Sequence, residues 1–218
     1  MYKKTIDRIL DYLSPDKCYF CTKNGEAICS ECMKNIIDNI GNIIDSNSPY
    51  IDKEFYIDNR KESDIIKLVD DYKFLPKRNN IYSLTVIIAD FLKNTAHFTD
   101  NPNDLILVPC PTSKKHIKQR GFDHILLLVQ VLSKTLNIKY QTIIKRKGNY
   151  KQLGASKKQR KEQALKSYYL DGDILKDKTY IIVDDIKTTG STLEAIAKIL
   201  KDNKVSRVWA LYILYQEK

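Results

Sequence analysis

The chain has 218 residues, enough for one full domain and a small additional segment but too few for two ordinary enzyme domains. Its contents of 43% apolar and 29% charged residues are ordinary for a globular protein, which excludes a disordered chain and a fibre. A formal net charge of +10 favours anionic partners such as phosphates or nucleic acid.

Nothing in the sequence predicts a membrane segment. A bilayer span needs about 20 apolar residues, and no apolar run approaches that length. The first 13 residues mix charged side chains into their apolar positions and lack the apolar centre of a signal peptide. We therefore expect a cytoplasmic protein with no membrane insertion.

The first 62 residues contain a cysteine segment between two predicted helices. Apolar spacing predicts short helices at residues 7–13 and 31–40. Residues 41–60 are polar and rich in Asn, Ser and Asp, which is typical of a linker. The predicted organisation is a zinc-binding segment at residues 1–40, a linker at 41–62 and one domain at 63–218.

Four of the five cysteines form two Cys-x-x-Cys pairs, Cys18 with Cys21 and Cys29 with Cys32. Each pair lets two thiolates reach one ion from a tight turn, and two pairs complete a tetrahedral shell for structural Zn²⁺. Disulfide bonds are the alternative, but a chain expected in a reducing compartment favours the metal. The fifth, Cys110, stands between two prolines, and we interpret it as a packed residue rather than a nucleophile.

The remainder of the chain is predicted to alternate strands and helices. Helical spacing of apolar residues is found at residues 63–72, 83–92, 122–136 and after residue 190. Short apolar runs indicate strands at residues 105–108, 140–144, 180–183 and 205–214. This order predicts an α/β fold with a parallel sheet flanked by helices. Ser191 and Glu194 fit a capping box at the start of the last helix.

The most informative segment is Tyr-Ile-Ile-Val-Asp-Asp-Ile-Lys-Thr-Thr-Gly-Ser-Thr at residues 180–192. Asp184 and Asp185 follow a buried strand, where carboxylates can accept hydrogen bonds from vicinal sugar hydroxyls. The turn of residues 188–192 precedes a helix whose free N–H groups can bind a phosphate. Gly190 lets the backbone approach such a ligand closely or adopt a positive φ.

This segment resembles the 5-phosphoribosyl-1-diphosphate (PRPP) loop of type I phosphoribosyltransferases. The resemblance implies that the two acids hold the ribose 2′- and 3′-hydroxyls and that the turn holds the 5′-phosphate. Lys187 departs from the family pattern, which commonly has an aliphatic residue there, and it adds positive charge near the phosphate. The matching positions are Asp184, Asp185, Thr188, Thr189, Gly190, Ser191 and Thr192.

Two other segments narrow the resemblance to the ComF family of competence proteins. Residues 107–113, Leu-Val-Pro-Cys-Pro-Thr-Ser, and residues 119–123, Gln-Arg-Gly-Phe-Asp, are similar to its Val-Pro-x-Pro … Arg-Gly-Phe-Asn segment. Residues 152–163 are similar to its Gln … Arg-x-x-Asn segment, although Asp123 and Gln163 stand where Asn is usual. The four-cysteine segment resembles the family's usual zinc-binding appendage.

The family fold also implies where the pyrophosphate of PRPP would lie. The turn of residues 109–113, which follows the strand at 105–108, would be near it. Arg120 would be available to that anion. The alternative for Arg120 is an ordinary solvated charge.

Two functions remain open from the sequence. An enzyme would break the bond between C1 and pyrophosphate and transfer the phosphoribosyl group to an unknown nitrogen acceptor. Mg²⁺ and basic residues would stabilise the departing pyrophosphate, and residues 145–161 would close over the site. The other function is DNA handling, in which PRPP binding is regulatory, structural or vestigial. The ComF resemblance implies a cytoplasmic role with incoming single-stranded DNA during natural transformation, and other DNA-uptake proteins as further partners.

The charge distribution favours DNA handling on a phosphoribosyltransferase fold. Residues 114–161 contain fourteen Lys and Arg and one acid, Asp123. Tyr140 and Tyr150 lie among them and would stack on unpaired bases. A solvated lysine face is the alternative. The residues predicted to contact nucleic acid are Lys145, Arg146, Lys147, Lys151, Lys157, Lys158 and Arg160.

Overall fold

The structure, a computed structural model, describes residues 17–61, 63, 65–74, 78–95, 98, 101–147 and 166–216. Its centre is a six-stranded sheet of order β1-β2-β8-β7-β3-β4, in which only β1 and β2 are antiparallel neighbours. These strands are β1 (Asn42–Asp45), β2 (Lys53–Asn59), β3 (Leu105–Pro109), β4 (Lys139–Tyr140), β7 (Thr179–Lys187) and β8 (Arg207–Tyr215). A separate antiparallel ribbon contains β5 (Ile144–Arg146) and β6 (Tyr168–Leu170).

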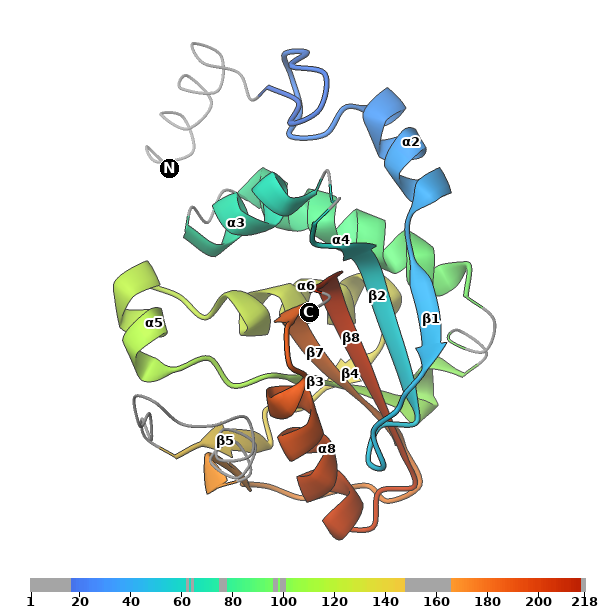
Figure 1. Ribbon diagram of the computed structural model, residues 1–218, viewed down its shortest axis with the longest axis vertical. Helices are drawn as coiled ribbons and strands as arrows, with labels where there is room; N and C mark the ends of the chain where they lie inside the picture. The colour runs from blue at the N-terminus through green and yellow to red at the C-terminus, as the bar shows by residue number, and fades with distance from the viewer. Residues whose placement is uncertain are drawn as a thin grey trace.

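Helices cover both faces of the sheet (Figure 1). Helix α8 packs on β7 and β8 at the front of Figure 1, whereas α4 and α6 pack on each other behind the sheet. The helices are α2 (Ser30–Asn39), α3 (Ile66–Phe74), α4 (Arg78–Lys93), α5 (Lys114–Arg120), α6 (His124–Leu136), α8 (Ser191–Asp202) and the 3₁₀ helix at Pro102–Asp104. Sheet and helices together confirm the predicted α/β fold with a mostly parallel sheet.

The predicted strands and helices of the C-terminal part form because their apolar faces meet in one core. All five residues of β3 are buried, as a central parallel strand covered on both faces requires. Helix α6 begins where the Asp123 carboxylate accepts the N–H of Leu126 at 3.2 Å. It ends at Asn137, whose φ of 54° is left-handed.

Half of the predicted linker at residues 41–62 belongs to the sheet, as strands β1 and β2. Strand β2 runs parallel to β8 with Phe55 opposite Leu211, and Phe55 and Ile57 are buried. The other face of β2 carries polar residues, one of which, Glu54, is buried and bonded to Lys187 and Tyr212. A strand of this kind has the composition of a linker although it lies inside the fold.

Two strand boundaries also differ from the prediction. Strand β7 continues past Asp184 and Asp185 to Lys187, because β8 is equally long and pairs with it up to Tyr215. The predicted strand at residues 140–144 is two strands, since β4 ends at Tyr140 and β5 leaves the main sheet to pair with β6.

Several predicted segments fall outside the described residues. They include the helix at residues 7–13 and residues 148–165, with Tyr150, Lys151, Lys157, Lys158 and Arg160. Within the part of the chain that is described, no helix combines the length and apolar character needed to cross a membrane.

Candidate functional site

The four N-terminal cysteines converge as the two Cys-x-x-Cys pairs predict. Their Sγ atoms all lie within 4.8 Å of one another, and those of Cys21 and Cys29 are 3.6 Å apart. Four thiolates around one zinc ion, with Zn–S bonds of about 2.3 Å, would have sulfur atoms about 3.8 Å apart. All five cysteines of the chain are free. The donor set and its spacing therefore fit a tetrahedral zinc site with four cysteine ligands.

Backbone hydrogen bonds shape the first cysteine pair into a tight turn. The N–H of Cys18 donates to the carbonyl of Lys23 at 2.9 Å, and Thr22, with φ of 61°, donates back to Cys18 at 3.0 Å. Burial alone would raise the pKa of Cys18, but backbone N–H groups of Cys21, Cys29 and neighbouring residues outweigh it and lower this pKa to about 6. The turn thus favours the thiolate, the form that binds metal.

The cysteine segment is attached to the rest of the fold by Tyr19, which lies between the first two cysteines. Its hydroxyl donates to Asp71 Oδ2 of α3 at 2.8 Å and accepts from Asn80 Nδ2 of α4 at 3.0 Å. Lys67 of α3 lies 5.7 Å from the centroid of its ring. Through these contacts with Tyr19, helix α3 attaches one side of the cysteine segment to the rest of the fold.

The loop after β7 turns sharply into helix α8. Gly190 occupies the N-cap position with a left-handed φ of 71°, and its carbonyl accepts the N–H of Glu194 at 2.9 Å. The predicted capping box is wrong, because the helix begins at Ser191 itself and this hydroxyl contacts Thr189 Oγ1 at 3.0 Å. Thr188 and Thr189 are exposed. The loop still presents hydroxyls and a helix N-terminus on one side.

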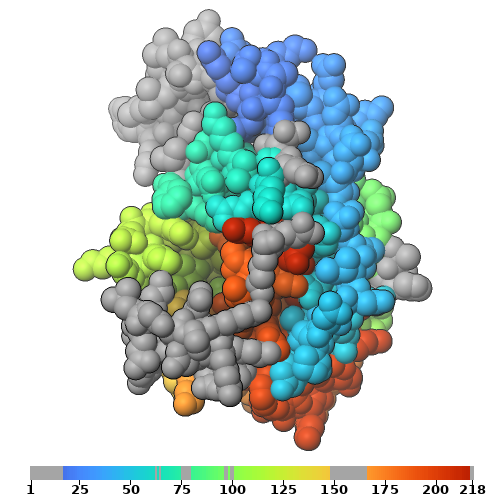
Figure 2. Space-filling model, in the orientation of Figure 1, coloured from blue at the N-terminus to red at the C-terminus, as the bar shows by residue number. Residues whose placement is uncertain are grey.

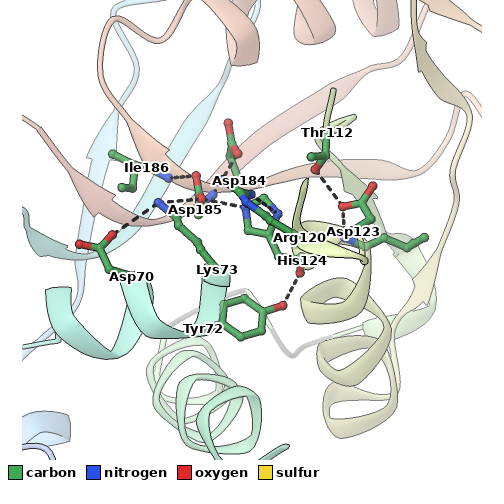
Figure 3. A network of polar contacts seen from close by, with 11 residues as sticks. Asp70, Tyr72, Lys73, Thr112, Arg120, Asp123, His124, Asp184, Asp185 and Ile186 are labelled. Carbon is green, nitrogen blue, oxygen red and sulfur yellow. Dashed lines mark hydrogen bonds and ion pairs between the residues drawn. The ribbon is translucent and has the colours of Figure 1, made fainter. Parts of the chain in front are cut away.

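The two acids at the end of β7 point to opposite faces of the sheet, as successive residues of a strand must. Figure 3 shows Asp185 directed toward α3 and α6 and Asp184 directed away from them. Asp185 Oδ2 lies 2.9 Å from Lys73 Nζ and 2.9 Å from His124 Nε2. Burial would raise the pKa of Asp185, but the His124 hydrogen bond and the Lys73 charge hold it below its usual range. Asp185 is thus a largely buried, ionised carboxylate that contacts Lys73 and His124 through Oδ2 and accepts the N–H of Ile186 through Oδ1 at 2.6 Å.

Asp184 has a different environment from its neighbour. Its Oδ1 accepts the N–H of Asp185 at 3.0 Å, and it also forms a hydrogen bond with the buried Cys110 thiol. Burial raises the pKa of Asp184 to about 7, and the charge of Asp185 adds to the rise. Burial and the Asp184 carboxylate raise the pKa of Cys110 well above its usual value, and its burial confirms Cys110 as a packed residue. On the same side, Tyr168 of β6 forms a hydrogen bond with Thr192.

Lys73 and His124 are the functional-site residues that sequence reasoning missed. Lys73 lies in α3, far from the acids along the chain, and it is only 8% exposed. His124 is the first residue of α6, and its carbonyl accepts the hydroxyl of the buried Tyr72. A lysine just after the predicted helix at residues 63–72 and one histidine near the start of another predicted helix carry no signal by themselves, because only the fold brings them together.

Arg120 and Lys187 occupy places that the motifs did not predict. Arg120 Nη1 is 3.0 Å from His124 Nδ1, and its guanidinium lies 5.2 Å from the centroid of the Phe74 ring. The side chain of Lys187 lies beside Gly190 of the phosphate loop, and its charge is paired within the fold. It forms an ion pair with Glu54 and lies over the rings of Tyr212 and Tyr215, at 5.3 and 5.5 Å from their centroids.

A cleft of about 680 Å³ opens beside this region, between α5 and the β5–β6 ribbon. The predicted pyrophosphate turn contributes Pro109 to Thr112, and cations come from Lys114, Lys145, Arg146 and Lys147. Asp123 and Asp171 are the acids that line it. Arg146 Nε is buried and, among the described residues, has no hydrogen-bond partner. The cleft therefore has more cationic than acidic residues in its lining.

Comparisons with known proteins agree with this geometry. A model of the phosphoribosyl transferase domain matches residues 126–217. The chain is 34% identical over 111 residues to Competence protein F of Haemophilus influenzae, covering 48% of this chain and 48% of that protein. The chain thus matches about half the length of this curated relative.

Solved structures that are similar to the chain include two phosphoribosyltransferases. The adenine phosphoribosyl transferase of Trypanosoma brucei, in complex with AMP, pyrophosphate and ribose-5-phosphate, is 12% identical with a TM-score of 0.43, covering 81% of this chain and 87% of that one. The purine phosphoribosyltransferase of Pyrococcus horikoshii is 19% identical with a TM-score of 0.37, covering 76% and 89%. From the matching domain model, the competence relative and the four clustered cysteines, we conclude that the chain has a type I phosphoribosyltransferase-like fold and is similar to Competence protein F over about half its length.

Proposed function

We propose that this protein binds PRPP and handles single-stranded DNA in the cytoplasm during natural transformation. The observation that carries the PRPP part is the arrangement around β7 and α8. An acid pair at the end of a central strand leads through a left-handed glycine into a helix N-terminus lined with hydroxyls. Sugar hydroxyls and a 5′-phosphate are the groups that such an arrangement recognises.

The cationic cleft is a suitable place for the pyrophosphate of PRPP, and this supports the proposal. The cleft begins at the turn after β3, and β3 is the neighbour of β7 in the sheet. Lys114, Lys145 and Lys147, which line the cleft, would offer their charges to an anion there. Mg²⁺ bound with PRPP would add positive charge there, and structural zinc would remain in the cysteine segment.

PRPP affinity is expected to rise with pH up to about 7 and then to level off. Asp184 accepts hydrogen bonds from ribose hydroxyls only as a carboxylate, and its pKa is raised to about 7. Below that pH, the dissociation constant should increase toward tenfold per pH unit, because one proton must be released on binding. Isothermal titration calorimetry from pH 5.5 to 8.5 measures this dependence.

The ligand's own phosphate titrates near pH 6, so Asp184→Asn is the matched control. We expect this variant to bind PRPP more weakly and to retain only the part of the pH dependence that comes from the phosphate. Identical pH profiles for the variant and the wild type would remove Asp184 from the sugar site.

Single-stranded DNA is expected to bind the cationic residues of β5 and the segment that follows. Each phosphate contact contributes about −0.7 to the slope of log affinity against log salt for single strands. Lys145→Gln with Lys147→Gln should therefore flatten the slope by about 1.4. Fluorescence anisotropy with a labelled oligothymidine across a salt series measures it.

Lys134→Gln with Lys139→Gln is the matched control, because it removes the same charge from exposed positions on α6 and β4. If both pairs change the slope equally, net charge alone accounts for binding, and the basic surface is merely solvated.

The alternative function is phosphoribosyl transfer to a nitrogen acceptor. The match to the phosphoribosyl transferase domain favours it. Release of pyrophosphate from PRPP in the presence of bases or amines would support this enzyme, whereas salt-sensitive DNA binding without turnover supports handling.

A further inference from the structure

Helix α5 presents charge of only one sign. Lys114, Lys115 and Lys118 are exposed, the helix contains no acidic residue, and none of its residues is buried. Among the described residues, no carboxylate forms a salt bridge with these three lysines. Their charges are therefore available to an anion in solution. Figure 2 shows the helix, in yellow-green, projecting from the body of the molecule.

An aromatic ring with a fixed cation lies at one end of α5. Phe74, the last residue of α3, is 64% exposed, and the Arg120 guanidinium lies 5.2 Å from its ring centroid. The contact with His124 Nδ1 holds Arg120 in place at 3.0 Å. A single exposed apolar ring is ordinary. A ring with a positioned guanidinium beside it is also a stacking platform for a planar base, because both groups attract its π-face.

A second pair of the same kind lies on the other side of α5. Tyr169 of β6 is 40% exposed, and Lys147 Nζ lies 5.7 Å from its ring centroid. Lys114 and Ile117 of α5 line the same cleft as Tyr169 and Lys147. Figure 1 shows α5 between the end of α3 and the β5–β6 ribbon. A helix whose formal charges are all positive thus lies between two aromatic rings that each have a cation beside them.

We propose that a single-stranded nucleic acid crosses α5, with one base stacked on Phe74, another on Tyr169, and phosphates bound by Lys115 and Lys118. This inference rests on the proposed DNA handling and extends it across α5 from the ribbon to the end of α3. The pattern fits a single strand better than a duplex, because bases reach aromatic rings only when unpaired. It fits nucleic acid better than an acidic peptide, because a peptide of Asp and Glu has no π-face to place on the rings.

Binding of labelled oligothymidine by Phe74→Ala tests the stacking. The dissociation constant should increase by about fivefold to a hundredfold at every salt concentration, with the slope of log affinity against log salt unchanged. Phe74→Trp keeps a ring at this position and should restore binding, which loss of Arg120 positioning by itself would not explain. Tyr50→Ala is the matched control, since Tyr50 also has a lysine beside its ring, with Lys198 Nζ at 5.5 Å from the centroid, but this pair lies at α8 rather than at α5.

Binding by Lys115→Gln with Lys118→Gln tests the phosphate contacts. The slope should flatten by about 1.4, whereas Lys134→Gln with Lys139→Gln should leave it unchanged. If Phe74→Ala and the α5 lysine pair bind like the wild type while Lys145→Gln with Lys147→Gln binds weakly, the inference is overturned and the proposed function stands. If the wild type does not bind the oligonucleotide at all, the DNA-handling function fails first. Polyglutamate of equal charge should displace the labelled strand less effectively than unlabelled oligothymidine does. Equal displacement by the two polymers would also overturn the role of the rings.

Discussion

The purified, reduced protein is expected to contain about one zinc ion per chain, and Cys21→Ser is expected to lose it. Structural zinc sites in small peptides contribute an apparent binding free energy of about 10–16 kcal/mol, and this energy holds the segment folded. In this chain, three remaining thiolates cannot complete the tetrahedral shell. Elemental analysis and a zinc-release assay measure the ion.

Loss of the ion should loosen the contact of Tyr19 with Asp71 and leave the α/β core folded. Cys110→Ser is the matched control, because it removes a cysteine that lies in the core away from the cluster and should retain zinc. Freshly prepared protein without zinc would contradict the prediction, and so would a Cys21→Ser variant with full zinc content.

Replacing Asp185 by alanine should lower the free energy of unfolding by roughly 3–5 kcal/mol. The variant leaves the buried Lys73 ammonium and the His124 ring without the carboxylate that both contact at 2.9 Å. Urea unfolding, with the tyrosine and tryptophan signals as probes, gives this value. The double variant Lys73→Met with Asp185→Leu removes both charges and should recover most of the loss, because an apolar pair of similar size often replaces a buried ion pair at little cost.

The acid dependence of stability provides a second measurement of the same pair. The pKa of Asp185 is held below its usual range, so its contribution is complete above the unfolded-state value of about 3.9 and is lost as the pH falls below it. The stabilities of the wild type and Asp185→Ala should therefore converge in acid. PRPP titration of the stable double variant separates binding from folding, and unchanged affinity would show that Asp185 does not contact the ligand.

The parts of this molecule that could be predicted from sequence are those whose determinants are local. The first cysteine pair forms a tight turn and the second starts helix α2, and an apolar run followed by acids, threonines and a glycine encodes strand, loop and helix within thirteen residues, 180–192. The α/β order followed from the same runs. Even here the predicted capping hydrogen bonds at the start of α8 were wrong, because Gly190, with a left-handed φ, occupies the N-cap position that the motif assigns to Ser191.

The parts that could not be predicted depend on contacts between distant segments. Glu54 makes β2 look like a polar linker, yet it is buried because Lys187 and Tyr212 are present to bond it. Lys73 becomes a site residue only because α3 packs at the carboxyl end of β7. The region that matches the phosphoribosyl transferase domain, residues 126–217, contains neither Lys73 nor His124. A search for partners of Asp185 within that region would therefore miss both residues.

The place of β2 in the sheet has a consequence for dissecting this protein. A truncated chain beginning at residue 63 would lack β1 and β2 and would turn β8 from an interior strand into an edge. Seven of its nine residues, Val208 to Leu214, are buried, so that edge would be long, flat and apolar with unpaired backbone groups. Such edges recruit further chains, and the fragment is expected to aggregate rather than behave as an independent domain. Strands β1 and β2 and the phosphoribosyltransferase-like domain therefore form one folding unit.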